Sequence, residues 1–311
     1  MNDRTSAALE IEIVPSALDA NGDGLSDAAL FKRGNCSIID GAAGTKTLVA
    51  TALGGKQSVA ANADYDGDGS SECATVSINK KTLKWSFQER GTSVVEVESF
   101  GKPSDYVLTG CNLDATPEKE LAVMRGANVL MKHKGAATTT VSLPRLYSGK
   151  LRGCGDIDGD GTDELLFRTT SGRGRKMKYN LVALNTSGAV VATESNVGLF
   201  DRAYAVDGFG STSNDIVLTT GSTSRKTLVI RERGATSVAA TIPGLRQGLS
   251  IGVCRDGAGD YASCLQHADA GGQLVRRMLK SAESINTAIP TDRRLVIDAV
   301  NIYGPGLTPL P

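Results

Sequence analysis

Histidine and tryptophan are scarce in this sequence, which holds two histidines and one tryptophan in 311 residues. An enzyme needs a base, an acid or a nucleophile gathered in one pocket, and histidine is the side chain used most often for proton transfer. The G-x-S-x-G, HExxH and nucleotide-loop patterns are also missing. We therefore expect His133 and His267 to be solvated turn residues, and a binding function is favoured over catalysis.

Long apolar runs and an excess of one charge are also missing. No apolar run approaches the roughly 18 residues of a membrane-spanning helix, and the first residues lack the basic and then apolar order of a signal peptide. The formal net charge is +0, so the overall charge does not indicate nucleic acid or an anionic membrane as a partner. We expect no nucleic-acid binding and no membrane insertion.

The six cysteines show neither a CxxC motif nor a zinc-site spacing, which leaves structural thiols or disulfides. We expect an exported protein, secreted, periplasmic or at the cell surface, whose leader is not part of this chain. A disulfide between Cys254 and Cys264 would close one hairpin, and Cys111 could pair with Cys154 at matching depth in successive repeats. Cys36 and Cys73 lie at opposite ends of their predicted strands, so we expect them not to pair.

What the sequence does contain is a repeated acidic loop. The stretch DIDGDGTDELLF from Asp156 places carboxylates at every second position, and DANGDGLSDAALF from Asp19 and DYDGDGSSECATV from Asp64 follow the same pattern. Like charges this close repel one another unless a cation lies among them, and hard oxygen ligands suit Ca²⁺ best. The three loops therefore predict about three calcium sites.

The spacing assigns a role to each position of a nine-residue loop. Side chains at positions 1, 3 and 5, a backbone carbonyl at position 7 and a carboxylate at position 9 would surround the ion, while glycines at positions 4 and 6 allow the tight turn. The predicted ligands are Asp19, Asn21, Asp23, Leu25 and Asp27 in the first loop, Asp64, Asp66, Asp68, Ser70 and Glu72 in the second, and Asp156, Asp158, Asp160, Thr162 and Glu164 in the third.

Two other interpretations of these loops compete with the predicted calcium site. An EF-hand requires an acidic residue at position 12, where this sequence has Leu30, Thr75 and Phe167. Simple polar turns are the second alternative, and one loop alone would not distinguish them from a metal site. Three loops at a regular spacing favour the metal.

The loop belongs to a longer repeat. Weaker copies start at Asn112, Asp207, Cys254 and Asn301, so seven starts recur about every 47 residues, a period typical of propeller blades or solenoid units. The copy from Asn112 has lost both glycines and has Thr116 at position 5, and the last three copies lack the carboxylates. We expect these four loops to hold no metal, the last three being bare turns.

Between the loops the sequence predicts strands. Each repeat contains four short apolar or alternating stretches, such as ELLFRTT, TLKWSFQ, SVVEVESF and SDYVLTGCN, separated by turn residues. This pattern, without any segment of helical period, predicts an all-β fold of four-stranded antiparallel blades. We expect a single domain over residues 1–311, a seven-bladed β-propeller; six blades with an extra strand is the alternative.

The motif D-x-[DN]-G-D-G-x-x-[DE] followed by an apolar strand resembles the FG-GAP or VCBS repeats of integrin α-subunits and of many bacterial surface proteins. The resemblance covers essentially the whole chain, although only three units match the motif fully. It implies a propeller with calcium-binding loops. The expected function is a calcium-stabilised binding or adhesion module for protein or glycan partners; the alternative is a polysaccharide lyase-like enzyme, since some lyases are built on related propellers.

One basic turn is a candidate ligand-binding surface. The stretch SGRGRKMK from Ser171 carries Arg173, Arg175 and Lys176, which could contact an anionic protein or glycan. Ordinary solubilising charge is the alternative, because other turns of the chain are also basic.

Overall fold

The computed structural model of the chain describes residues 18–32, 35–42, 46–51, 53–54, 58–147, 150–206, 215–222, 225–231, 240–245, 249–255, 261–268, 273–278, 284–288, 294–296 and 301–309. These residues form antiparallel sheets and three short 3₁₀ helices, η1 (Arg145–Tyr147), η2 (Gly174–Lys176) and η3 (Pro305–Leu307). In this part of the chain there is no helix with the length and apolar character that crossing a bilayer requires.

The acidic loops from Asp19, Asp64 and Asn112 lead into strands of the first three sheets along the chain. The first has the order β24 (Arg294–Val296), β1 (Ala28–Lys32), β2 (Asn35–Ile39), β3 (Lys46–Ala50). The second has the order β4 (Val59–Ala60), β5 (Cys73–Asn79), β6 (Thr82–Gln88), β7 (Glu96–Ser99). The third has the order β11 (Thr139–Ser142), β10 (Asn128–Lys132), β9 (Leu121–Arg125), β8 (Tyr106–Thr109), β25 (Asn301–Gly304), β26 (Thr308–Pro309).

The other three sheets each take four consecutive strands. The fourth has the order β12 (Leu151–Gly155), β13 (Glu164–Ser171), β14 (Lys178–Leu184), β15 (Val190–Glu194). The fifth has the order β16 (Arg202–Val206), β17 (Asp215–Ser222), β18 (Arg225–Arg231), β19 (Ala240–Leu245). The sixth has the order β20 (Leu249–Arg255), β21 (Tyr261–Ala268), β22 (Gln273–Met278), β23 (Ser284–Ala288).

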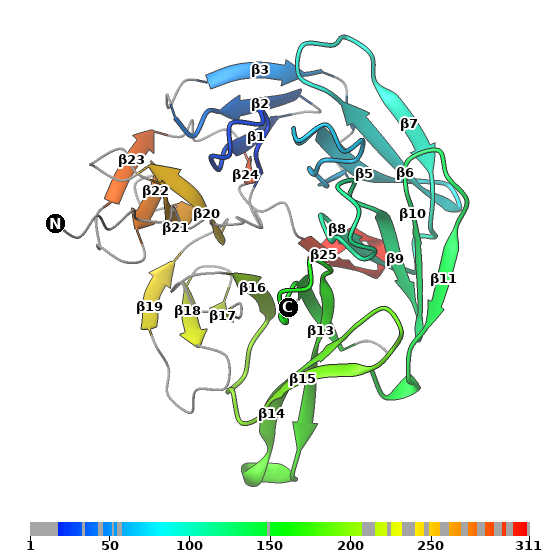
Figure 1. Cartoon of the computed structure of the whole chain (residues 1–311), viewed down its shortest axis with the longest axis vertical. Coiled ribbons are helices and arrows are strands. Elements are labelled where there is room, and N and C mark those ends of the chain that lie inside the picture. Colours follow the sequence, from blue (N-terminus) through cyan, green and yellow to red (C-terminus); the bar gives the residue numbers. More distant parts are fainter. Residues whose placement is uncertain are drawn as a thin grey trace, which may run out of the picture.

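The predicted all-β class is confirmed, and so are the four-stranded antiparallel sheets, except that the third sheet has six strands. The apolar stretches that follow the loops form the second strand of their sheets, as in β9 and β13, and the next alternating stretches form the third, as in β6 and β10. Figure 1 shows the sheets placed around a common centre, with β16, β24 and β25 towards the inside and β3, β7, β11 and β23 towards the outside. The arrangement is propeller-like.

The last predicted repeat does not form a sheet of its own within the described residues. The stretch from Asn301, expected to be a bare turn, is strand β25, which pairs with β8 through Ile302 opposite Leu108. Slightly earlier in the chain, β24 pairs with β1 through Val296 opposite Ala29. Both C-terminal strands thus satisfy backbone groups along strand edges that would otherwise be open.

Neighbouring sheets bury their apolar faces against each other. One core cluster joins Trp85 and Phe87 of the second sheet to Val107 and Val123 of the third. Another cluster extends from the third sheet to Phe167 of the fourth. Because both faces of these sheets are covered, second strands such as β9 and β13 are apolar on both sides, as in the LLF of β13. The acidic loops lie at the ends of these well-packed strands.

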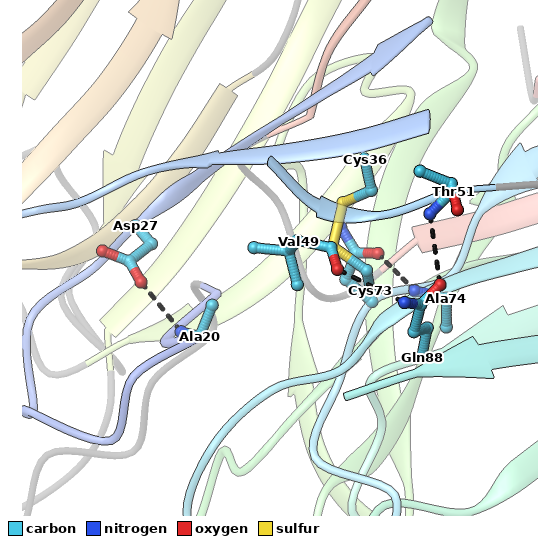
Figure 2. Close-up of a disulfide and its surroundings, with 9 residues drawn as sticks. Ala20, Asp27, Cys36, Val49, Thr51, Cys73, Ala74 and Gln88 are labelled. Carbon is cyan, nitrogen blue, oxygen red and sulfur yellow. Dashed lines mark hydrogen bonds between the residues drawn. A yellow bond between two sulfur atoms is a disulfide. The ribbon is translucent and has the colours of Figure 1, made fainter. Parts of the chain in front are cut away.

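Two of the three disulfides were expected and one was not. Cys111–Cys154 and Cys254–Cys264 are both formed. The expectation that Cys36 and Cys73 stay unpaired is wrong: they are bonded, with their Cα atoms 6.3 Å apart. Figure 2 shows this bond joining the first sheet to the second. Position along each strand did not predict the pair, because the distance between cysteines of two sheets depends on the offset at which the sheets pack.

Hydrogen bonds of the Gln88 side chain also join the first and second sheets. Gln88 accepts the backbone N–H of Thr51 at 3.1 Å, and its amide nitrogen donates to the carbonyls of Val49 and Thr92 at 3.4 and 2.8 Å. Gln88 ends β6 of the second sheet, while Val49 belongs to β3 of the first. The first two sheets are therefore held together by apolar packing, a disulfide and a buried amide.

The disulfides allow a graded test of stability. Replacing both Cys111 and Cys154 by Ala frees a loop between residues 43 apart, which should lower the free energy of unfolding by about 4 kcal/mol on the loop-entropy model. The matched control is the double Ala variant of Cys254 and Cys264, which are 10 residues apart and should lose about 3 kcal/mol on the same model. Urea unfolding of both variants would measure the difference, and the reverse order of effects would contradict the model.

Candidate metal centres

Four acidic loops lie at equivalent places, each immediately before the second strand of its sheet. We name them L1 (residues 19–27), L2 (residues 64–72), L3 (residues 112–120) and L4 (residues 156–164). The predicted loops from Asp207 and Cys254 have most of their residues outside the described ranges. The location that the sequence indicates for the metal loops, between the first and second strands of a unit, is confirmed for L2, L3 and L4.

L2 and L4 each bring three carboxylates together. In L2, oxygen atoms of Asp64, Asp66 and Glu72 all lie within 4.8 Å of one another. In L4 the same is true of Asp156, Asp158 and Glu164. These residues hold positions 1, 3 and 9 of the predicted ligand set. Three hard oxygen donors at this separation match the chemistry of a Ca²⁺ site.

The glutamates at position 9, which close L2 and L4, are buried. Only one of the two carboxylate oxygens of each closing glutamate accepts a hydrogen bond. Glu72 is 2 % exposed and Glu164 is 1 % exposed. One oxygen of each accepts the N–H of the residue at position 2, from Tyr65 at 2.7 Å and from Ile157 at 2.8 Å. The other oxygen, Oε1 in both residues, is buried without a hydrogen-bond partner. A buried carboxylate oxygen left in this state requires an explanation, and a cation among the three carboxylates supplies one.

The aspartate at position 1 organises the backbone of its loop. Asp64 accepts the N–H groups of Gly67 and Gly69 at 2.7 and 3.0 Å, and these glycines have φ angles of 77° and 88°. Asp156 accepts the corresponding N–H groups in L4 at 2.6 and 3.0 Å. The left-handed φ values explain why positions 4 and 6 are glycine. The turn is therefore fixed by the chain's own hydrogen bonds.

The acid at position 5 has a different partner in these loops. In L1, L2 and L4 its exposed carboxylate accepts the N–H of position 7, at 2.8, 2.7 and 2.8 Å, and it does not belong to the converging groups. The residues concerned are Asp23 with Leu25, Asp68 with Ser70, and Asp160 with Thr162. The ligand roles assigned to these six residues stay predictions.

L1 is built differently from L2 and L4. Its closing acid, Asp27, is fully buried but accepts two N–H groups, from Ala20 at 2.9 Å and from Gly41 at 2.6 Å. Position 3 is Asn21, whose amide nitrogen donates to Asp23 at 3.2 Å and to Asp40 at 3.1 Å. Asp40 was not predicted, because it comes from the turn between β2 and β3. L1 is not among the converging groups of acidic side chains in the described residues.

L3 contains a cluster that the sequence did not predict. Asp114 and Glu120 converge with His133, whose Nε2 atom lies 2.9 Å from Oδ2 of Asp114. His133 does lie in a turn, but its side chain is 25 % exposed and packs on L3, so the expectation that it is solvated is wrong. The expectation that L3 lacks a metal site rested on its missing glycines. The histidine comes from the turn after β10, which no spacing rule connects to this loop.

The four loops form a continuous hydrogen-bonded chain. The N–H at position 8 of one loop donates to the carbonyl at position 1 of the preceding loop in all three junctions. The bonds are Ser71 to Asp19 at 2.6 Å, Lys119 to Asp64 at 2.7 Å and Asp163 to Asn112 at 2.6 Å. Each junction joins neighbouring sheets, so the residue that carries the first ligand of a loop is anchored by the next loop.

A lysine of the chain lies beside L2. The Nζ atom of Lys134, in the turn after β10, is 3.8 Å from Asp66 and 3.1 Å from Glu96. Its positive charge lowers the pKa of Glu72, yet burial dominates and raises that pKa to about 8. Burial likewise raises the pKa of Glu164 to about 7. Without a bound cation, Glu72 therefore favours the protonated form at neutral pH, and the pKa of Glu164 lies close to neutral pH.

The pKa shifts predict an unusual pH dependence in chelator. The ordinary pKa of Glu is 4.5, and the folded-state values of Glu72 and Glu164 are about 8 and about 7. The folded chain then binds more protons than the unfolded chain across that window, so the contribution of these groups to stability falls as pH rises through it. We expect the urea midpoint in EDTA to fall from pH 5 to pH 8, and added Ca²⁺ to remove the fall by binding the deprotonated groups.

The control for this prediction is the Glu72→Gln, Glu164→Gln variant, which cannot titrate at these positions. Its midpoint in EDTA should change less between pH 5 and pH 8 than that of the parent. Identical pH profiles for the variant and the parent would contradict the assignment of the effect to the closing glutamates.

The basic turn lies on the hairpin that joins β13 to β14. Its short helix η2 (Gly174–Lys176) is at the tip, and Arg173 and Lys176 are exposed. The side chain of Arg175 lies outside the described part of the chain. L4 precedes the opposite end of β13. The basic tip and the metal loop are thus at the two ends of one strand.

Comparison with known proteins adds no assignment to this geometry. No protein-family model and no curated protein matches the sequence. The resemblance to FG-GAP or VCBS repeats therefore depends on the loop motif and the strand pattern.

Proposed function

We propose that the chain is a calcium-stabilised β-propeller that binds a protein or glycan partner outside the cytoplasm. The observation that carries the calcium assignment is the pair of matched clusters in L2 and L4, where a buried glutamate keeps one oxygen without a hydrogen-bond partner beside two aspartates. Donor chemistry favours calcium over a transition metal at these two loops, because all three groups are carboxylates.

In this proposal the metal has a structural role. L2 and L4 would hold Ca²⁺ through Asp64, Asp66 and Glu72 and through Asp156, Asp158 and Glu164. A bound cation would remove the repulsion within each cluster and stabilise the ionised state of the buried glutamate. Because position 8 of each loop is bonded to the loop before it, order in L2 and L4 would extend to L1 and L3. L1 would bind more weakly, since Asp27 is already saturated by N–H donors.

A six-bladed architecture is the form of propeller that we propose. Six sheets occur in the described residues, and the first combines β1 to β3 with β24 from late in the chain. A sheet that takes strands from both terminal regions would close the ring of blades. The motif in L1, L2 and L4 supports membership of the FG-GAP or VCBS repeat class within this proposal.

The proposed location and partner rest on two further features. Three disulfides in one chain are typical of proteins from oxidising compartments. The β13–β14 hairpin presents exposed Arg173 and Lys176 beside Met177, which is also exposed. A protruding tip with cationic and apolar side chains suits an anionic glycan or an acidic protein surface.

Chelation tests the calcium assignment. Each site that binds only the folded state adds about 2.7 kcal/mol at a hundredfold excess of Ca²⁺ over Kd, so EDTA should lower the melting temperature and Ca²⁺ should restore it. Elemental analysis should find at least two calcium ions per chain. The Asp66→Ala and Asp158→Ala variants should each lose about one equivalent, and the double variant about two. An unchanged melting curve in EDTA together with a metal-free protein would overturn the assignment.

Charge reversal tests the binding surface. The Arg173→Glu, Arg175→Glu, Lys176→Glu variant should lose binding to sulfated or uronic-acid glycans on an array by at least about tenfold, because three attractive charges become repulsive. Its melting temperature and calcium content should stay those of the parent. Lys80→Glu, Lys81→Glu, in the turn between β5 and β6, is the matched control. Equal glycan binding by all three proteins would show that the hairpin charges serve solubility.

A further inference from the structure

A second candidate site lies at the far end of β12 from L4, around a buried arginine. Arg152 is the second residue of β12 and is only 8 % exposed. The pairing of β12 with β13 shifts in register between Leu151 and Gly153, so Arg152 is the extra residue of a β-bulge. Bulges redirect a side chain at the expense of regular pairing. Arg152 lies outside the motifs that predict a site from the sequence.

The guanidinium of Arg152 is incompletely paired. Its Nη1 atom donates to the carbonyl of Leu151 at 2.6 Å, while its Nε atom is buried and has no hydrogen-bond partner. The Nε side of an arginine fork is one of the edges that bind a carboxylate with two parallel hydrogen bonds. A buried charge with an unused donor edge is unfavourable unless a counter-charge is supplied.

The charged groups that act on Arg152 do not supply this counter-charge. Burial lowers the pKa of Arg152, and the like charge of Arg168 on β13 lowers it further, whereas Tyr106 and Asp201 act in the opposite direction. Among the described residues Asp201 forms no ion pair with either arginine. Arg168 thus adds a second positive charge that acts on Arg152, and Asp201 does not neutralise either of them by an ion pair.

Arg168 is held in place by other contacts. Its Nη1 atom donates to the carbonyl of Phe200, and the guanidinium carbon lies 6.0 Å from the ring centres of Tyr179 and of Phe200. These contacts come from two different segments, so the position of the second positive charge is fixed before any ligand binds. A preorganised pair of cations reduces the entropic cost of binding an anion.

The neighbouring sheet packs tightly on the residues of β12 that follow Arg152. The neighbouring strand β16 approaches β12 so closely that a Cβ atom on Gly153 would lie 1.8 Å from the carbonyl oxygen of Ala203. A Cβ atom on Gly155 would lie 2.7 Å from the backbone nitrogen of Ala205. Glycine at both positions permits this approach.

We propose that Arg152 and Arg168 form a binding site for a carboxylate, which pairs with the open Nε edge of Arg152 and lies within the field of Arg168. The carboxylate belongs either to a free small acid or to a uronic acid residue, since both offer the same planar group. The site is separate from the calcium loops, which precede the other end of β13, and it does not depend on the proposed calcium function.

Thermal unfolding in matched salts is the first test, carried out on the full chain with Ca²⁺ present. Raising sodium acetate from about 1 to about 100 mM, with chloride replaced at constant ionic strength, should raise the melting temperature of the parent by a few degrees. Arg152→Met removes the buried charge and keeps much of the volume. This variant should melt higher than the parent without acetate and should not respond to it. Arg90→Met, at an exposed arginine, should respond as the parent does.

Nuclear magnetic resonance supplies a direct second measurement. The Nε–H signal of Arg152, assigned by its loss in Arg152→Met, should shift and saturate on titration with acetate. Glucuronate is the second titrant: saturation by both acids supports a site open to sugar acids, and saturation by acetate alone supports a site for small free acids. No shift with either titrant, or equal acetate stabilisation of the parent and Arg152→Met, would overturn the proposal. Neither result depends on calcium content, which distinguishes this test from that of the metal loops.

Discussion

Packing of each sheet against the next is the constraint on which the rest of this molecule depends. A four-stranded sheet with apolar residues on both faces cannot be stable alone in water, so the strands around Trp85, Val123 and Phe167 require neighbours on both sides. The same packing determines where the acidic loops lie. It brings position 8 of one loop onto position 1 of the previous loop, and it brings His133 and Lys134 over L3 and L2.

This packing brings carboxylates close together, and their mutual repulsion opposes the arrangement. The loops concentrate carboxylates at the ends of buried strands, and the closing glutamates lose their solvation. Donors of the chain itself offset part of this repulsion. They are glycine N–H groups in L2 and L4, the N–H of Gly41, which donates to Asp27 of L1 from the turn after β2, and the ammonium of Lys134 beside L2. Among the buried carboxylates of the four described loops, one oxygen of Glu72 and one of Glu164 stay without a hydrogen-bond partner. That difference separates L2 and L4 from L1, although the three sequences look equivalent.

The sequence predicted what depends on local spacing. The strands, the acidic loops before the second strand of each unit, and the glycines with positive φ all follow from patterns a few residues long. It could not predict what depends on the offset between sheets. The Cys36–Cys73 bond, Asp40 beside Asn21, and His133 against Asp114 all join segments that only the packing brings together. The bulge at Arg152 was missed for a related reason, because a single extra residue in an apolar strand leaves no mark in the pattern.

The first and third sheets include strands from near the end of the sequence, and this has a consequence for synthesis on the ribosome. Strands β1 and β8 emerge early but find partners on their inner edges only when β24 and β25 have been made. Until then the first and third sheets each present an open edge, the kind of surface on which other chains can add strands. The three sheets formed by β12 to β23 consist of consecutive strands, so each can complete its strand pairing as soon as its own four strands have been synthesised. Strand β1, the earliest strand of the described residues, is therefore among the last to complete its backbone hydrogen bonds. A ribosome that stalls before β24 would release a chain with two sheets still open.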